Sequence, residues 1–274
     1  MADNVAENAV YSEGQMEDVL NKRAEANINI NEKDKDGFTA LMVAVKIQAP
    51  IEIIQTLLDE GADINAEDDW AYNALDHAVE NNYVEAAKLF IEKGADVNRT
   101  AGYDRTALMI AAEANSADSV KLLLDHGAQI DVKDTMHNWS ALMHAAAKNS
   151  ADAVRILMKH GANSSLRNDP PNPDNEAIDL AANPCFNTAL TIAASKNSLN
   201  ALKALIDCGA DINIKDNQGS TALDIAKWYV REKHKGQEMI DLLKDARRKL
   251  FLKKTLPILI AGVALIVIFS MLSK

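Results

Sequence analysis

The chain has 274 residues, 48% of them hydrophobic, which is enough for one extended folded domain and an appendage. Its two cysteines, Cys185 and Cys208, exclude a disulfide framework and favour a reducing compartment. The net charge of −11 is unevenly divided, because residues 247–274 hold six basic and no acidic residues and residues 1–246 carry −17. Such an acidic domain would repel nucleic-acid phosphates and favours basic or neutral protein partners.

The first 33 residues are predicted to contain a tail and a partial repeat. Residues 1–14 are acidic and polar, so we expect them to be disordered and find no cleavable signal peptide in them. Met16 and Leu20 lie at helical spacing, and residues 26–29 read Ala-Asn-Ile-Asn. Because this ending echoes the Ala-Asp-Ile-Asn of the units that follow, residues 15–33 are predicted to be a degraded half-repeat that caps an array.

Two short signatures recur along the rest of the chain. A triplet of the type Thr-Ala-Leu begins at Thr39, Asn73, Thr106, Ser140, Thr188 and Thr221, and a Gly-Ala pair begins at Gly61, Gly94, Gly127, Gly161 and Gly209. Successive glycines are 33, 33, 34 and 48 residues apart, which is a period near 33 with one excess of 15 residues. A fixed period of this length is the signature of a solenoid.

Each unit is predicted to form two short amphipathic helices. Thr39 is placed to cap the first helix, and Leu41 and Ala44 share one face of it. The second helix contains Leu57 and ends at Gly61, because glycine most easily adopts a left-handed C-cap conformation. The spacing of a capping box occurs at Thr221 with Asp224 and at Asn73 with Asp76. No unit could bury its apolar face alone, so the units are expected to stack.

These motifs resemble the ankyrin repeat family. Residues 34–44 (DKDGFTALMVA), 57–65 (LLDEGADIN) and 216–226 (DNQGSTALDIA) follow the family pattern closely. The resemblance covers roughly residues 15–246 and implies an all-α solenoid of about six helix-turn-helix units with β-hairpin loops. Every copy has Ala where the family usually has Pro, and none keeps the His that braces the Thr. We therefore expect somewhat looser helix starts.

The predicted repeats are divided by one insertion. The repeats are expected at about residues 34–67, 68–100, 101–133, 134–167, 187–215 and 216–246. The insertion, residues 168–186, contains four prolines that forbid a continuous helix. It could be a projecting finger that selects a partner, because recognition concentrates in loops on rigid scaffolds, or a tolerated insertion without a role.

The C-terminal residues change character. Residues 255–272 contain no charge, and as a helix they would span about 27 Å, close to the thickness of a thin bilayer core. Pro257 lies near the start of this predicted transmembrane helix, and residues 247–254 form a basic juxtamembrane segment. The bases on this side predict a single-pass protein with its repeats in the cytoplasm. The alternatives are a buried terminal helix or a hydrophobic dimer contact.

Only Ser273 and Lys274 follow the predicted span, so membrane insertion would have to follow translation. This arrangement resembles the tail-anchored class of membrane proteins. In a eukaryotic cell the expected destination is the endoplasmic reticulum or the outer mitochondrial membrane.

The sequence offers no credible catalytic constellation. His126 and His160 precede the glycines of adjacent units, but no Cys, Asp or Glu completes a ligand set with the spacing of a zinc site. Cys185 lies in the insertion without a His close by in the sequence, and no phosphate-binding glycine loop is present. The protein is therefore predicted not to be an enzyme and to use no metal, cofactor, small-molecule substrate or nucleic acid.

A protein-binding surface remains as the functional site. In the ankyrin family, partners usually contact the hairpin tips and the exposed side of the first helices. By position, the resemblance implies the partner-binding residues Lys35, Phe38, Lys46, Asp69, Trp70, Tyr72, Glu80, Asn81, Tyr103, Arg105, Glu113, His137, Trp139, Lys148, Trp228 and Tyr229. All three tryptophans of the chain are among them, and aromatic and Arg anchors are enriched in binding hot spots. Local packing is the competing interpretation, and it is stronger for Phe38 and Trp139 than for Trp70 and Tyr103.

Three functions compete. The first is a membrane-anchored protein–protein interaction scaffold whose groove recruits a cytosolic partner to a membrane. One version of it is a secreted effector of an intracellular bacterium, with which the degenerate repeats are compatible. The second is a regulatory or inhibitory subunit of a membrane enzyme or channel. The third is an enzyme with its chemistry in the inserted segment, where Cys185 and Asp169 would be the residues to substitute.

Overall fold

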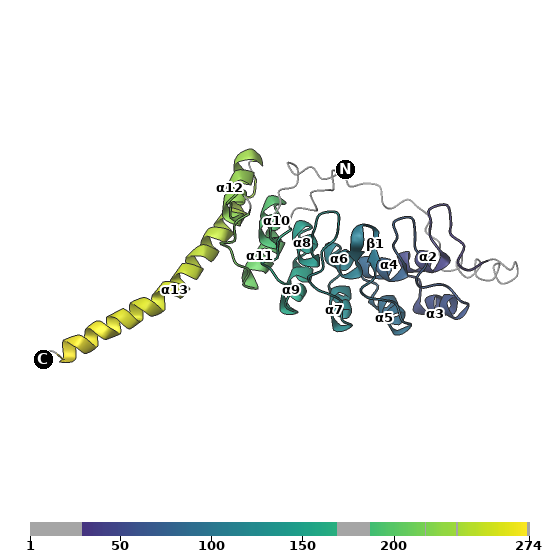
Figure 1. Ribbon diagram of the computed structural model, residues 1–274, viewed down its shortest axis with the longest axis horizontal. Helices are drawn as coiled ribbons and strands as arrows, with labels where there is room; N and C mark the ends of the chain where they lie inside the picture. The colour runs from purple at the N-terminus through teal and green to yellow at the C-terminus, as the bar shows by residue number, and fades with distance from the viewer. Residues whose placement is uncertain (1–28, 169–186, 217, 234, 273–274) are drawn as a thin grey trace.

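The computed structural model describes residues 29–168, 187–216, 218–233 and 235–272, with side chains as far as residue 256. Within these residues the chain forms six pairs of α-helices in one elongated stack (Figure 1). The first helices of the pairs are α2 (Ala40–Lys46), α4 (Ala74–Glu80), α6 (Ala107–Glu113), α8 (Ala141–Ala147), α10 (Ala189–Ser195) and α12 (Ala222–Lys233). The second helices are α3 (Ile51–Asp59), α5 (Val84–Glu92), α7 (Ala117–Asp125), α9 (Ala151–Lys159), α11 (Leu199–Asp207) and α13 (Gln237–Leu272).

The pairs form two layers. Each first helix packs against the first helix of the next pair, and each second helix against the next second helix. Leu41 and Ala44 of α2 are buried, and so are their counterparts in every other first helix. Small alanines let the helices approach closely, while the leucines fill the space between them. The predicted all-α solenoid is therefore confirmed.

Most first helices begin with the predicted side-chain cap. The Oγ1 atoms of Thr39 and Thr106 accept hydrogen bonds from backbone amides three residues later. Asn73 and Asp76 form a complete capping box, as do Thr188 and Thr191. At α8, Ser140 makes no such bond. The residue in place of the family's His thus supplies the reciprocal hydrogen bond in some repeats and not in others.

The loops between pairs are held more by aspartate side chains than by strands. In the described residues, one loop pairs as strands, β1 (Thr100–Ala101) with β2 (Arg105–Thr106), around the 3₁₀ turn η1 (Gly102–Asp104). The Oδ1 atoms of Asp34, Asp68 and Asp216 each accept hydrogen bonds from the backbone amides two and four residues later. The Asx turn therefore replaces most of the hairpin ladder that the resemblance implied.

A repeated pair of polar contacts links neighbouring repeats. Asn82, Asn115 and Asn149 have positive φ, and each Oδ1 accepts a hydrogen bond from a backbone amide in the second helix of the next repeat. The hydroxyls of Ser116, Ser150 and Ser198 donate hydrogen bonds to carbonyls at the end of the first helix of the preceding repeat. The bonds of Asn149 and Ser198 join α8–α9 to α10–α11. The stacking register therefore continues across the insertion, whose base is held by a hydrogen bond from Asn168 N to Asn187 O.

The last helix, α13, begins as the second helix of the sixth pair, where Met239 and Leu243 are buried, and then projects from the stack (Figure 1). The expectation that Pro257 lies near a helix start is wrong, because α13 begins at Gln237. Among the residues that the structure describes in full, no helix is long and apolar enough to cross a membrane. The predicted span of residues 255–272 lies mostly beyond the described side chains and stays a prediction.

Other predicted segments also lie outside the described residues. They are the tail of residues 1–14, most of the half-repeat cap of residues 15–33, and the interior of the insertion with Cys185.

Candidate partner-binding surface

Two of the six first helices contain a buried histidine at the same position. His77 in α4 and His144 in α8 each follow their helix-capping residue by four positions. The equivalent positions hold Val43, Ile110, Ile192 and Ile225. The His77 Nε2 atom lies 2.9 Å from Asp68 Oδ2, and His144 Nε2 lies 2.5 Å from Asp134 Oδ2. In both repeats the histidine therefore braces the aspartate that shapes the preceding loop.

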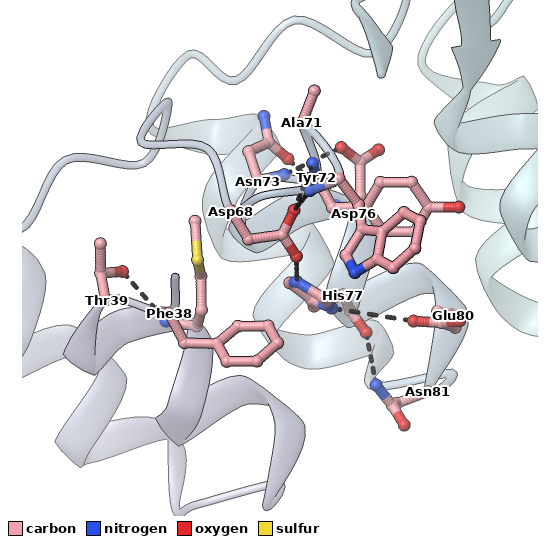
Figure 2. A network of polar contacts seen from close by, with 12 residues as sticks. Phe38, Thr39, Asp68, Ala71, Tyr72, Asn73, Asp76, His77, Glu80 and Asn81 are labelled. Carbon is pink, nitrogen blue, oxygen red and sulfur yellow. Dashed lines mark hydrogen bonds and ion pairs between the residues drawn. The ribbon is translucent and has the colours of Figure 1, made fainter. Parts of the chain in front are cut away.

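Figure 2 shows the network around His77. Its Nδ1 atom lies 3.7 Å from a carboxylate oxygen of Glu80, one helical turn later. The ring of Phe38, from the preceding repeat, approaches His77 edge-on with 5.5 Å between ring centroids. Lys46 Nζ lies 3.6 Å from the centroid of the Phe38 ring. Asn81 donates to the His77 carbonyl at 2.8 Å. This part of the surface is thus a packed local cluster with charged side chains at its edge.

Asp76 is a buried carboxylate next to this cluster. Its Oδ2 atom accepts hydrogen bonds from Asn73 N and from Arg99 Nη1, each at 3.0 Å. Burial raises the pKa of Asp76 from 3.8 to about 6, and the Asn73 hydrogen bond and the Arg99 charge only partly oppose this. Asp76 therefore caps the start of α4, although burial disfavours its charged form.

The network around His144 extends into the preceding repeat. The His144 Nδ1 atom lies 3.5 Å from Glu113 Oε2 at the end of α6. Glu113 also pairs with Arg105 and, at 2.9 Å, with Lys148. Arg105 Nη1 in turn donates to the Tyr72 hydroxyl at 2.9 Å. One chain of polar contacts thus joins the second, third and fourth repeats.

These contacts shift the pKa values of the groups involved. Burial lowers the pKa of His144, but hydrogen bonds with Asp134 and Glu113 outweigh it and raise the pKa above 6.5. The His144 hydrogen bond lowers the pKa of Glu113 far below its ordinary value, against the effect of burial. Burial raises the pKa of Asp134, but the His144 hydrogen bond and charge together with the backbone hydrogen bonds from His137 and Trp139 outweigh it, so the pKa is lowered. The charged forms of all three groups are therefore stabilised together.

The same residues line a cavity of about 460 Å³ between the loop of the fourth repeat and the ends of three first helices. The Trp139 side chain is 8% exposed and stacks on His137 with 4.7 Å between ring centroids. Burial lowers the pKa of His137. Lys148 and Lys196, at the C-caps of α8 and α10, are exposed at the cavity rim. We call this cavity the fourth-repeat pocket.

A row of large exposed side chains lies beside the pocket. Trp70, Tyr103 and Met136 occupy equivalent positions in three successive loop tips and are 74%, 62% and 44% exposed. Gly102 N donates to Trp70 O at 3.3 Å, and Thr135 N donates to Tyr103 O at 2.9 Å, so the tips lie side by side. Met136 belongs to both features, because it also lines the pocket. We call these three residues the tip row.

The structure sorts the sequence-predicted site residues into groups. Phe38, Lys46, Tyr72, Glu80 and Asn81 surround His77, while Arg105, Glu113, His137, Trp139 and Lys148 surround His144. Lys35, Asp69, Trp70 and Tyr103 are exposed on the loop tips. Trp228 and Tyr229 lie on α12, in neither network.

Sequence reasoning missed the two buried histidines, their aspartates, and Met136 and Lys196. The signal was a His at a position that is aliphatic in the other repeats, nine or ten residues after a loop Asp. His126 and His160, which were weighed instead, each have Nδ1 at 2.8 Å from a carbonyl of their own helix.

Comparison with known proteins agrees with this architecture. The family model described as "Ankyrin repeats (3 copies)" matches residues 7–101 and 100–168, and "Ankyrin repeats (many copies)" matches residues 175–226. No curated protein matches the sequence.

Two solved structures resemble the fold. The ankyrin repeat domain of Bcl-3, a member of the IkappaB protein family, is 23% identical with a TM-score of 0.60, and the match covers 85% of this chain and 93% of that one. The human ASB11 ankyrin repeat domain is 18% identical with a TM-score of 0.65, over 85% of this chain and 95% of that one. Ankyrin repeats are in general non-enzymatic modules of protein–protein interaction. The family models cover more than half of the sequence, and the chain belongs to the ankyrin repeat family.

Proposed function

We propose that this protein is a membrane-anchored scaffold that recruits a cytosolic protein partner through the loop tips and first helices of its first four repeats. The observation that carries the proposal is the coincidence of the tip row with the fourth-repeat pocket. Three exposed apolar side chains and a polar cavity lie on neighbouring repeats of one rigid stack. Large exposed apolar residues grouped on a rigid scaffold are typical of protein interaction sites.

The membrane part of the proposal rests on the sequence and on the course of α13. Residues 255–272 have no charged side chain, and basic residues precede them. α13 continues from the sixth repeat to Leu272 as a single helix. A membrane-inserted end would therefore hold the stack at a fixed place beside the bilayer. The basic residues favour repeats on the cytoplasmic side, at the endoplasmic reticulum or outer mitochondrial membrane of a eukaryotic cell.

Anchoring would explain how a modest surface can work. A partner restricted to the membrane plane meets the repeats at a raised effective concentration, so recruitment needs only moderate affinity. The proposed function is thus mechanical and requires no chemical step from the chain itself.

The experiment compares the membrane-bound fraction of two full-length double variants. Val263→Lys with Ile266→Lys puts two charges into the centre of the predicted span, and Phe251→Lys with Leu252→Lys puts the same charges into the exposed part of α13. We expect the first variant to become extractable by alkaline carbonate and the second to stay with the membrane. Equal extraction of both variants and of the unmodified chain would contradict the anchor. Recovery of an integral membrane complex instead of a soluble partner would favour the regulatory-subunit alternative.

A further inference from the structure

The fourth-repeat pocket differs in charge from the domain around it. Residues 1–246 carry a net charge of −17. Among the residues that the structure describes, the pocket is lined by Arg105, Lys148 and Lys196 and by two carboxylates, Asp134 and Glu113. It is therefore a locally cationic recess in an acidic protein, even with its two histidines neutral.

Both carboxylates of the pocket are already used within the protein. Asp134 is fully buried, and its oxygens accept from His137 N, from Trp139 N and from the His144 side chain. Glu113 pairs with Arg105, His144 and Lys148. Neither carboxylate is left to neutralise an incoming cation, so an anion is the ligand that the pocket favours.

Lys196 has positive charge that the described residues do not use. No ion pair or hydrogen bond of its ammonium group is found there, although its charge adds to the effect of burial in lowering the pKa of His137. Its position at the C-cap of α10 gives it a favourable interaction with the helix dipole, but this does not neutralise its charge. Lys148, at the C-cap of the neighbouring α8, has only one carboxylate partner, and it shares that partner with Arg105 and His144.

The same pocket collects unsatisfied polar atoms. Arg105 Nε, His137 Nδ1 and Trp139 Nε1 are buried and have no hydrogen-bond partner within the described protein. The only other such side-chain atom in the described residues is His77 Nδ1. Buried donors without partners cost free energy, and native proteins retain few of them. Folding therefore leaves hydrogen-bonding capacity unused mainly at this pocket.

The tip row indicates which chemical groups should lie next to the anionic group of the ligand. Met136 joins the pocket to Tyr103 and Trp70, which continue as an exposed apolar strip across two more repeats. Tyr103 holds this position with φ of 61°, a left-handed conformation that is unfavourable for a bulky residue. Asp69 and Asp104 flank the strip, so a uniformly acidic ligand would be repelled there.

We infer that the fourth-repeat pocket and the tip row together bind a short extended segment of a partner protein, in which one or two carboxylate side chains lie next to aromatic or aliphatic residues. The carboxylates lie against Lys148 and Lys196, and the apolar residues cover Met136, Tyr103 and Trp70. This inference rests on the proposed scaffold function and specifies the chemistry of its partner.

The test selects ligands from a phage library of random peptides on the full-length chain in detergent. Selected sequences should contain Asp or Glu beside aromatic or aliphatic residues. A synthetic peptide of the selected sequence should bind about tenfold more weakly to the double variant Lys148→Glu with Lys196→Glu. Trp70→Ala should weaken it about fivefold. Lys203→Glu, at another exposed lysine, on the second helix of the fifth repeat, is the control and should have no effect.

The outcomes separate this inference from the proposed function. Selection of basic or uncharged peptides whose binding still needs Trp70 would overturn the acidic-segment inference and leave the scaffold in place. Acidic peptides that bind the lysine double variant unchanged would overturn the pocket assignment. Failure to select any peptide would also count against the inference, while membrane attachment is decided independently by the carbonate extraction. All substituted residues are exposed, and circular dichroism checks that each variant is folded.

Discussion

The second and fourth repeats contain the same aspartate–histidine pair in the same positions, yet they surround it differently. In the second repeat, the Nδ1 atom of His77, which does not contact Asp68, faces Glu80 of the same helix, and Glu80 is about half exposed. In the fourth repeat, the Nδ1 atom of His144 faces Glu113 of the preceding repeat, and Glu113 also pairs with Arg105 and Lys148. The histidine of the second repeat thus contacts a glutamate of its own repeat, whereas His144 contacts Glu113 of the preceding repeat. This difference links the third and fourth repeats, and Glu113 also lines the fourth-repeat pocket.

The carboxylates beside the two histidines also differ in their electrostatics. Asp76 is buried with too few favourable partners, so its pKa is raised to about 6. Glu113 is partly exposed and surrounded by His144, Lys148 and Arg105, so its pKa is strongly lowered. Burial alone opposes a negative charge, and neighbouring cations decide whether the charge becomes favourable.

The largest expected effect comes from removing the aspartates. Asp134→Ala should lower the free energy of unfolding by about 3–5 kcal/mol, because it leaves His144 and two loop amides without their buried partner. Asp68→Ala should cost less, because His77 belongs to a cluster around its own helix and not to a network that joins three repeats. Urea unfolding followed by circular dichroism measures both values. If Asp134→Ala lowered the free energy of unfolding by less than Asp68→Ala, the network that joins the repeats would not depend on Asp134.

Removing the carboxylate that distinguishes the repeats should have a smaller effect. Glu113→Gln should cost about 1–2 kcal/mol, because Arg105, Lys148 and His144 lose a shared charged acceptor. Glu80→Gln is the matched change in the second repeat and should cost no more than about 0.5 kcal/mol, because Glu80 is exposed to solvent. Equal losses in the two variants would remove the proposed difference between the repeats.

The pH dependence of stability should separate the two regions. The pKa of Asp76 is about 6 in the folded state against an ordinary 3.8, so the unfolding free energy should fall as pH rises through this window. The pKa of His144 is raised above 6.5, so its contribution should be complete below 6.5 and lost as pH rises through the higher folded value.

Two variants assign these windows. Asp76→Asn should flatten the dependence in the lower window only, and His144→Gln in the upper window only. Unfolding curves at a series of pH values measure both effects. A change in the opposite window for either variant would show that the assignment is incorrect.

The smallest effect is expected at the edge of the second-repeat cluster. Lys46→Ala should cost about 0.5 kcal/mol, because the exposed ammonium loses its contact with the Phe38 ring. Thermal unfolding of this variant measures the cost, and Lys88→Ala, on the second helix α5, is the control. A loss comparable to that of Glu113→Gln would mean that the second repeat is more tightly coupled than its contacts indicate.

Repeat length, helix pairing and helix caps could be predicted because they depend on short-range patterns. The glycine after each of the first five second helices and the Thr, Asn or Ser before each first helix are local signals, and the structure has a helix boundary at each of them. Strand pairing was harder to predict, since Asp34, Asp68 and Asp216 close their loops by side-chain hydrogen bonds that leave little backbone ladder.

The candidate partner-binding residues were chosen by their position in the repeat, and their interactions could not be predicted from the sequence. Local packing was the stronger interpretation for Trp139 than for Trp70, and Trp139 is indeed buried while Trp70 is exposed, but the stacking of Trp139 on His137 could not be predicted. His144 could not be paired with Glu113 from the sequence, because the two belong to different repeats and meet only when α6 and α8 pack. Lys196 joins the same pocket from beyond the insertion, a relation that no local pattern carries.

The sequence by itself determined the periodic stack of helix pairs, because each helix, cap and turn is specified by residues a few positions apart. It also supplied the uncharged C-terminal segment on which the proposed membrane anchor depends. Only the tertiary structure decided which charged groups neutralise one another and which remain available at the surface. Those contacts join residues of different repeats, and their energies depend on distances and burial that exist only once the repeats have stacked.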